Sequence, residues 1–154
     1  CQNNGYAEHT KYEYGTGAAT IADRGLAYGI PGVEVDGNDA VAMWQAASTA
    51  IARARAGEGP TLLEANTFRF RGHLMGDDSH YIAKEEMAAA IAADPLPRFR
   101  AWLIEQGHAT DGQLADIEAT NVAAFEEAVE FGLASPYPDV SELDKDVVAE
   151  GAQA

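Results

Sequence analysis

The sequence predicts an α/β fold built on a pair of parallel strands, with a helical region towards the C-terminus. Two short apolar runs, 32–35 and 61–66, have the length and the bounding residues of buried strands. A helical pattern at 39–56 lies between them, so the three pieces form a βαβ unit with a right-handed crossover. After residue 84 helical patterns dominate the chain.

Composition describes a globular chain and excludes several classes of partner. Its 154 residues can bury one modest core, and the apolar (47%) and charged (23%) fractions are ordinary for a globular domain. A net charge of −15 opposes binding to nucleic acid and to anionic membranes. No apolar run approaches the ~20 residues of a membrane span. Cys1 is the one cysteine, so no intrachain disulfide can form, which favours a cytoplasmic protein.

Turn residues divide the first forty residues into short elements. Asn3-Asn4-Gly5 is a strong turn signal that could follow a strand. Residues 20–27 form a short helical candidate, because glycine and proline follow it. After the strand at 32–35, the polar turn at 36–39 offers Asn38 as the N-cap of the long helix. The start of the sequence has no methionine and no targeting pattern, and we expect it to lie inside a longer protein.

The helix at 39–56 is predicted to pack on the sheet through one face. Four residues at helical spacing make up that face: Val41, Trp44, Ser48 and Ile51. We expect Trp44 to lie in the core. Arg53 and Arg55 favour the C-terminal end of the helix dipole, and Gly57 ends the helix.

Helices are predicted through most of the C-terminal region. The first, at 84–93, is broken by Asp94-Pro95-Leu96-Pro97, and a second follows at 98–106. Thr110 and Gln113 form a capping-box pattern that opens a third helix, which extends to about residue 133. The buried face of this third helix is expected at Leu114, Ile117, Phe125 and Val129.

These patterns predict one domain in three parts. Residues 1–83 form the βαβ part, and residues 84–134 form a helical C-terminal region of the same domain. Residues 135–154 are acidic and rich in alanine, so we expect an extended acidic tail.

The loop at 67–81 is the candidate site, because it concentrates the chemistry of the chain. It follows the second strand and holds two arginines, two histidines and two aspartates. The end of a strand in an α/β fold is a common place for ligand chemistry. Arg69 offers a planar fork that suits a phosphate or carboxylate, and His73 is a candidate proton carrier. A plain solvated loop explains these residues equally well.

Five segments share their order and spacing with one known family. They are Cys1-Gln2-Asn3-Asn4-Gly5-Tyr6, the turn at 32–39, Gly-Pro-Thr-Leu-Leu-Glu at 59–64, Thr-Phe-Arg-Phe-Arg-Gly-His at 67–73, and Ala-Ser-Pro-Tyr-Pro at 134–138. The chain resembles the C-terminal part of the alpha subunit of thiamine-diphosphate-dependent 2-oxo acid dehydrogenases, which act on pyruvate, branched-chain 2-oxo acids or acetoin. The resemblance implies a thiamine-diphosphate-binding fold, of which this chain forms the C-terminal half as an incomplete doubly wound parallel sheet.

The resemblance also implies roles for four residues. Asn4, through its side-chain oxygen, and Tyr6, through its backbone carbonyl, match the family's ligands of magnesium, which prefers hard oxygen donors. Asn4 taken alone is more simply read as a turn residue. Arg69 matches the arginine that grips the cofactor diphosphate. His73 matches the histidine beside the thiazolium, as a catalytic residue that handles protons or stabilises an oxyanion.

The implied reaction is the decarboxylation of a 2-oxo acid, or the corresponding acetoin reaction, with transfer of the product group to lipoamide. Its partners are a beta subunit, which supplies the activating glutamate, and a lipoyl acyltransferase. The family's Gly-Asp-Gly segment, which completes the metal and diphosphate site, would precede Cys1. We therefore expect this chain to be inactive alone and to associate with itself, because strands absent from it would leave apolar surface and strand edges uncovered.

Two alternatives remain at this point. The chain could be a non-catalytic binding or assembly module derived from the same fold. It could also be a small α/β protein of another class, in which Arg69 and Arg71 bind an anion without selectivity for thiamine.

Overall fold

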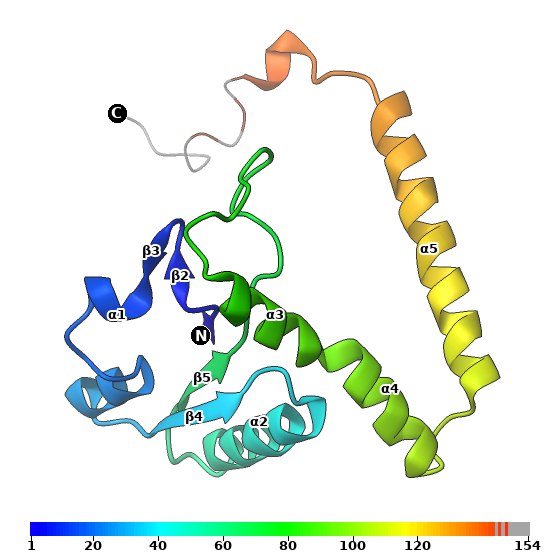
Figure 1. The fold of residues 1–154 in the computed structure, drawn as a ribbon. Helices are drawn as coiled ribbons and strands as arrows, with labels where there is room; N and C mark the ends of the chain where they lie inside the picture. The colour runs from blue at the N-terminus through cyan, green and yellow to red at the C-terminus, as the bar shows by residue number, and fades with distance from the viewer. Residues whose placement is uncertain (144, 146, 148–154) are drawn as a thin grey trace. The chain divides into compact units, whose positions relative to one another are not determined.

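The computed structural model describes residues 1–143, 145 and 147. The chain divides into two compact units, Cys1–His108 and Ala109–Ala154. The first contains the sheet and most of the helices, and the second contains one long helix and a short 3-10 turn (Figure 1). Each unit is described here by itself.

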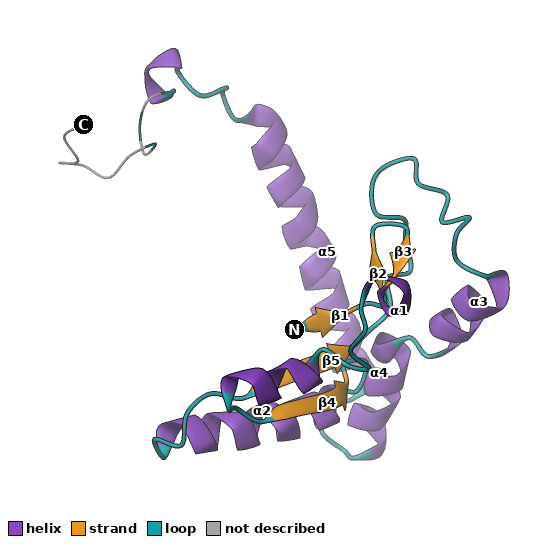
Figure 2. Cartoon of the chain, turned by 90° about the vertical axis from the view of Figure 1, so that its left-hand side faces the viewer, coloured by secondary structure: helices purple, strands orange, loops and turns teal. Residues whose placement is uncertain are grey.

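A three-stranded parallel sheet is the centre of the first unit (Figure 2). Its strands are β1 (Gln2–Asn3), β4 (Gly32–Asp36) and β5 (Leu62–Asn66), in the order β1-β5-β4. The predicted parallel pair is confirmed, and Glu34 of β4 lies directly opposite Glu64 of β5 in the register. The turn signal near the N-terminus does follow a strand, β1, which pairs with β5. The carboxyl ends of β1 and β5 therefore lie side by side.

Helix α2 (Ala40–Arg55) makes the crossover between β4 and β5. Its N-cap is Asp39, whose Oδ1 accepts hydrogen bonds from the backbone N–H groups of Val41 and Ala42, both at 2.9 Å. The predicted cap, Asn38, is one residue too early. The backbone N–H of Asn38 instead donates to Oδ1 of Asp36, the last residue of β4, so Asn38 belongs to the turn between β4 and α2.

A 3-10 helix, η1 (Ala22–Tyr28), replaces the short α-helix expected at 20–27. It packs tightly on the start of β4. A Cβ added at Gly32 would lie 1.9 Å from the carbonyl oxygen of Ala22, so only glycine permits this approach. Gly29, at φ 66°, ends the 3-10 helix in the left-handed region.

The segment after β1 contains two elements that the sequence analysis did not predict. Strands β2 (Tyr6–Ala7) and β3 (Thr10–Lys11) form an antiparallel hairpin, and α1 (Tyr12–Gly15) follows. Two-residue strands are too short to produce an alternating pattern of apolar and polar residues, so periodicity cannot detect them. In Figure 1 this hairpin lies beside the loop that leads from β5 to α3.

Helices α3 (Lys84–Ala92) and α4 (Pro95–Glu105) complete the first unit. The predicted break between the two helices is confirmed, because α3 ends before α4 begins. The start predicted for α4, at 98, is too late: the prolines at 95 and 97 lie inside its first turn, where proline is tolerated because no backbone N–H is needed there. Asp94 is the N-cap and accepts from the backbone N–H of Leu96 at 2.9 Å.

The second unit consists of α5 (Asp111–Ala134) and the 3-10 turn η2 (Val140–Glu142). The predicted capping box of α5 is confirmed: Thr110 accepts from the backbone N–H of Gln113, and the Gln113 side chain accepts from the backbone N–H of Thr110. The tail predicted at 135–154 contains η2, and residues 144, 146 and 148–154 of it lie outside the described part.

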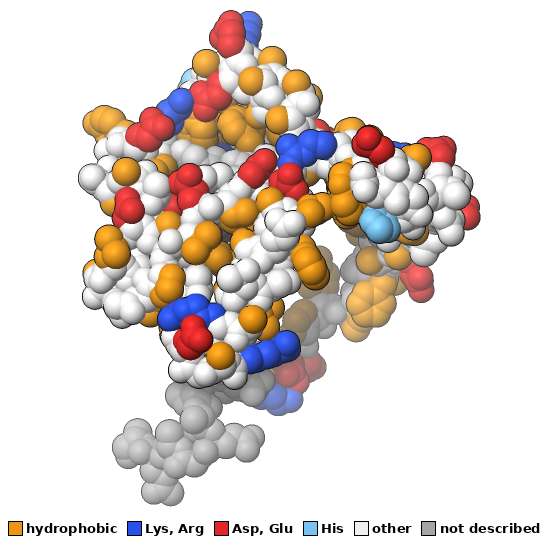
Figure 3. Space-filling view, turned by 90° about the horizontal axis from the view of Figure 1, so that it is seen from below, with side chains coloured by type: hydrophobic (Ala, Val, Ile, Leu, Met, Phe, Trp, Pro, Cys, Tyr) orange, Lys and Arg blue, Asp and Glu red, His pale blue; other side chains and the backbone are white. Residues whose placement is uncertain are grey.

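Burial differs most from the prediction. Trp44, expected in the core, is 70% exposed, and Ile51 is also exposed. On α5, the side chain of Phe125 is 70% exposed, and Ile117 and Val129 are exposed as well. Figure 3 shows hydrophobic side chains at the surface. Helical spacing identifies the face that would pack, but burial also needs a partner surface, and within its own unit neither set of residues is covered by one.

The described helices were also compared with the requirements of a membrane span. None of them is both long and apolar enough to cross a bilayer.

Candidate functional site

The Asn3-Asn4-Gly5 turn lies at the carboxyl end of β1. Asn3 Oδ1 accepts from the backbone N–H of Gly5 at 2.9 Å, and Asn4 Oδ1 accepts from the backbone N–H of Tyr6 at 3.0 Å. Gly5 has φ 78°, which favours glycine. Two successive side-chain caps therefore define the backbone of the turn.

Two oxygen atoms on this turn fit part of a magnesium site as ligands. The Asn4 amide oxygen and the Tyr6 backbone carbonyl are hard, neutral oxygens of the kind that Mg²⁺ takes in proteins. Among the described residues no group of three histidine, cysteine or acidic side chains could hold a metal.

Arg69 ties the loop after β5 to the hairpin. Its Nε donates to the Arg71 carbonyl at 3.0 Å, and its Nη2 donates to the Glu8 carbonyl at 3.0 Å and to the Tyr81 hydroxyl at 2.9 Å. Its Nη1 lies 3.2 Å from His73 Nδ1. Four of the five N–H donors are thus engaged by described residues, and the fifth is the second N–H of Nη1. The structure brings the predicted Arg69 and His73 into direct contact.

The contact with Arg69 determines the orientation of the His73 proton. A guanidinium can only donate, so Nδ1 of His73 must accept. In the neutral ring the proton is then on Nε2, on the side of the ring away from Arg69. The His73 side chain is exposed, so Nε2 is accessible from outside the loop.

Asp77 organises the loop, a role that sequence reasoning missed. Oδ2 accepts from the backbone N–H of His73 at 2.7 Å and from the Tyr81 hydroxyl at 2.9 Å, and Oδ1 accepts from the backbone N–H of Ser79 at 2.8 Å. The side chain is only 3% exposed. The hydrogen bonds from the His73 and Ser79 backbones lower the pKa of Asp77 to about 2.

This lowered pKa predicts the acid sensitivity of the loop. The folded-state pKa of Asp77 lies below its usual value of about 3.9, so its contribution to stability is present above pH ~4 and is lost as the pH falls through about 2. We expect the Ser79 amide resonance in an NMR titration to shift with a midpoint near 2. The Asp77→Asn variant should lack this transition, and a midpoint near 4 in the unsubstituted protein would contradict the hydrogen-bond network.

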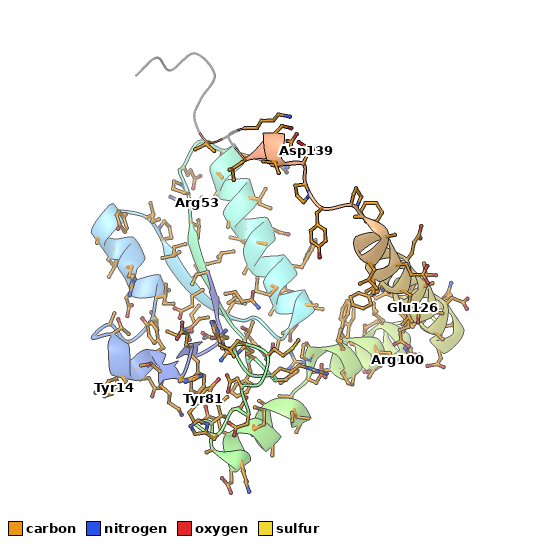
Figure 4. All side chains as sticks on the ribbon, turned by 90° about the horizontal axis from the view of Figure 1, so that it is seen from above. Tyr14, Arg53, Tyr81, Arg100, Glu126 and Asp139 are labelled. Carbon is orange, nitrogen blue, oxygen red and sulfur yellow. The ribbon has the colours of Figure 1, made fainter. Side chains whose placement is uncertain are left out.

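Two side chains from the hairpin and a third from helix α3 contact this network. The His9 ring stacks on Tyr81 with centroids 4.5 Å apart, and its Nε2 lies 3.5 Å from Asp77 Oδ2. The Tyr6 ring also lies against Tyr81, which is labelled in Figure 4, at 5.7 Å. The α3 residue is Glu86, whose Oε1 accepts from the Tyr6 hydroxyl at 2.9 Å. The segment that carries the candidate metal ligands thus packs directly on the loop that carries His73.

The carboxylate of Glu86 holds Tyr6 together with a lysine. Lys11 Nζ donates to Glu86 Oε2 at 2.8 Å. The hydrogen bond from Lys11, followed by that from Tyr6, lowers the pKa of Glu86. Burial, followed by the hydrogen bond to Glu86, raises the pKa of Tyr6. No sequence signal pointed to Glu86, which the analysis assigned only to a helix.

A buried carboxyl group lies beneath the turn. Glu64 of β5 is 1% exposed; its Oε1 accepts from Asn3 Nδ2 at 2.7 Å and its Oε2 from the backbone N–H of Ala22 at 2.8 Å. A cavity of about 280 Å³ lies beside it, lined partly by Asn4 and Tyr6. The sequence did contain a signal for this group, because Glu64 is the single acidic residue in the apolar run that forms β5.

The chain was compared with known proteins. The family described as Dehydrogenase E1 component matches residues 1–141. The alpha subunit of acetoin:2,6-dichlorophenolindophenol oxidoreductase from Bacillus subtilis (strain 168) is 44% identical over 147 residues, which are 95% of this chain and 44% of that protein. The alpha subunit of the pyruvate dehydrogenase E1 component from Porphyra purpurea is 36% identical over 149 residues, 97% of this chain and 43% of that protein.

A third relative is named for a branched-chain 2-oxo acid, 3-methyl-2-oxobutanoate. The alpha subunit of 3-methyl-2-oxobutanoate dehydrogenase from Mycobacterium tuberculosis (strain CDC 1551 / Oshkosh) is 44% identical over 107 residues, 69% of this chain and 29% of that protein. The chain spans less than half the length of each of these three curated relatives.

Proposed function

Because the chain belongs to the dehydrogenase E1 component family, we propose that it is part of the alpha subunit of a thiamine-diphosphate-dependent 2-oxo acid or acetoin dehydrogenase. One observation carries this proposal. Arg69 contacts His73 at 3.2 Å and donates to the hairpin that follows Asn4, so an anion-binding group, an imidazole and oxygen ligands meet beside the carboxyl ends of β1 and β5.

Each residue has a distinct task in this proposal. Asn4 and Tyr6 hold magnesium through the side-chain oxygen and the backbone carbonyl, and Arg69 directs its fifth N–H at the diphosphate. When bound, thiamine diphosphate supplies an electron sink for decarboxylation. His73 presents Nε2–H to an oxygen of the substrate, where it can donate a hydrogen bond or a proton.

Partners complete the site in this proposal. The relatives named above are alpha subunits, and a beta subunit and a lipoyl acyltransferase are the partners that we propose for this chain. The exposed apolar residues of α2 and α5 are consistent with burial in an oligomer. The two neutral oxygens on the turn favour a second candidate function, a non-catalytic binding or assembly module, because alone they would hold magnesium weakly.

Titration of the native protein with thiamine diphosphate, with and without Mg²⁺, tests the proposal. We expect magnesium-dependent binding that Arg69→Ala weakens by roughly tenfold or more, because hydrogen bonds to charged groups are the strong ones. Isothermal titration calorimetry measures both affinities. Arg71→Ala is the matched control: Arg71 is the neighbouring arginine and contacts Arg69 through its carbonyl, so its side chain should matter little.

The results separate the candidate functions. Equal losses in Arg69→Ala and Arg71→Ala, with phosphate binding as tightly as thiamine diphosphate, would favour a generic anion site. Absence of magnesium-dependent binding in the unsubstituted protein would favour the assembly module.

A further inference from the structure

Glu64 is the largest side chain that is fully buried among the described residues. It lies on β5, the central strand of the sheet, within an apolar run. Burial of a carboxyl group without hydrogen bonds is costly. Both of its oxygens accept one hydrogen bond, from the Asn3 side chain and from the backbone of Ala22. The roles assigned above to Asn4, Tyr6, Arg69 and His73 do not include this group.

The contact with Asn3 determines which way that amide faces. The Nδ2 group points to Glu64, so Oδ1 points to the backbone N–H of Gly5 and accepts from it at 2.9 Å. If the Asn3 amide were reversed, its oxygen would face the Glu64 carboxyl oxygen and its NH₂ would face the Gly5 N–H. Both contacts would be lost. Glu64 therefore selects the orientation that closes the turn around Asn4.

The second contact anchors Glu64 itself. The backbone N–H of Ala22 belongs to the first residue of η1, which packs on the start of β4. Ala22 is one of the two buried apolar residues of the described chain. One oxygen of the Glu64 carboxyl group is thus bound to the buried start of η1, and the other is bound to Asn3 in the turn. Glu64 therefore fixes the position of the turn relative to η1.

We propose that Glu64 is a positioning residue that holds the Asn3-Asn4-Gly5 turn in the conformation that presents the Asn4 oxygen to magnesium. The part that concerns magnesium rests on the proposed function. Groups that orient metal ligands without touching the metal commonly change metal affinity by roughly 10–100-fold when they are removed.

Glu64→Gln tests the contact with almost no change of shape. The new amide has one acceptor and one donor, but both neighbours, Asn3 Nδ2 and the Ala22 N–H, are donors. One hydrogen bond must therefore be lost. The double variant Asn3→Asp with Glu64→Gln restores the pattern: the amide at position 64 donates to the carboxylate at position 3, whose other oxygen still accepts from Gly5.

Two measurements are needed, and one of them is independent of any cofactor. Hydrogen exchange of the Gly5 amide in the native protein reports the turn. Calorimetric titration with Mg²⁺ in the presence of thiamine diphosphate reports the ligand. We expect Glu64→Gln to accelerate the exchange and to weaken magnesium binding by roughly 10–100-fold. The double variant should recover both values.

Glu58→Gln is the matched control. Glu58 precedes β5, at the end of the strand away from the turn, and its side chain is 63% exposed. The control removes the same charge outside the turn and the cavity beside it, so exchange and magnesium affinity should both stay unchanged. Asn3→Asp alone places two carboxyl groups face to face. It should accelerate the exchange of the Gly5 amide and weaken magnesium binding, which separates rescue in the double variant from a simple gain of negative charge.

The outcomes distinguish this inference from the proposed function. Absence of magnesium-dependent binding in the unsubstituted protein overturns the proposed function. If the unsubstituted protein binds, unchanged Gly5 exchange and magnesium affinity in Glu64→Gln overturn the role of Glu64 alone. If Glu64→Gln does not fold, the double variant carries the test: folding with native affinity supports the role, and failure of that variant overturns it.

Discussion

Replacing Gly72 with alanine is expected to lower turnover of the proposed complete enzyme, in which the whole alpha subunit and the beta subunit are present, by on the order of a hundredfold, the loss that a displacement of about 1 Å in a catalytic group can cause. A Cβ at position 72 would lie 2.4 Å from the carbonyl oxygen of Asp77 and 2.5 Å from its Cβ. Neither atom can yield alone, because Asp77 is held by the His73 N–H at 2.7 Å. The loop must open, and His73 moves with it.

The measurement combines turnover with hydrogen exchange of the Ser79 amide, which donates a hydrogen bond to Asp77 Oδ1. Overpacking of this kind costs about 1–3 kcal/mol, so the fold should persist while the loop loses protection. Gly132→Ala in α5 is the control, since a Cβ at that position meets nothing within 4 Å. Native protection in Gly72→Ala would contradict the predicted opening of the loop, and lost protection with native turnover would show that the loop conformation is irrelevant to the reaction.

Asp77→Ala is expected to produce the second large effect, again on the order of a hundredfold in kcat. The carboxylate accepts from three donors, two of them at Oδ2. Alanine has no acceptor, so all three donors lose their partner. The backbone of His73 is then released, and its Nε2 no longer has a defined direction.

A comparison of kcat with cofactor affinity separates this effect from general destabilisation. Arg69 keeps its contacts to the carbonyls of Glu8 and Arg71, so affinity for thiamine diphosphate should fall less than kcat. Asp78→Ala is the matched control. Asp78 is the adjacent aspartate, its side chain is exposed, and its described contacts are with His80. Equal losses in both variants would argue against a special role for Asp77.

Local sequence patterns predicted the elements whose signals are themselves local. The apolar runs at 32–35 and 61–66 predicted β4 and β5, and their connection by a helix predicted their parallel pairing. The capping box at Thr110 is another local signal, because both of its partners lie within one turn. The chemistry of the loop after β5 identified Arg69 and His73, motif order added their family roles, and these roles stay predictions.

Contacts between distant segments decided the rest of the candidate site. His9 contacts Asp77, Glu86 accepts from Tyr6, and Glu64 accepts from Asn3. The two hydrogen bonds join residues that are 80 and 61 positions apart in the sequence. A hydrogen bond of this kind depends on how strands and loops meet in space, and no spacing rule encodes it.

Burial also required the folded chain. Helical spacing correctly placed Trp44 on one face of α2, yet the side chain is exposed because apolar character specifies a tendency to pack and not the presence of a partner. The sequence thus determines the βαβ unit, the capping box of α5 and the identity of the chemical groups in the loop. The tertiary structure determines which carboxylates hold those groups in place, because their hydrogen bonds form only when β1, β5 and the hairpin come together.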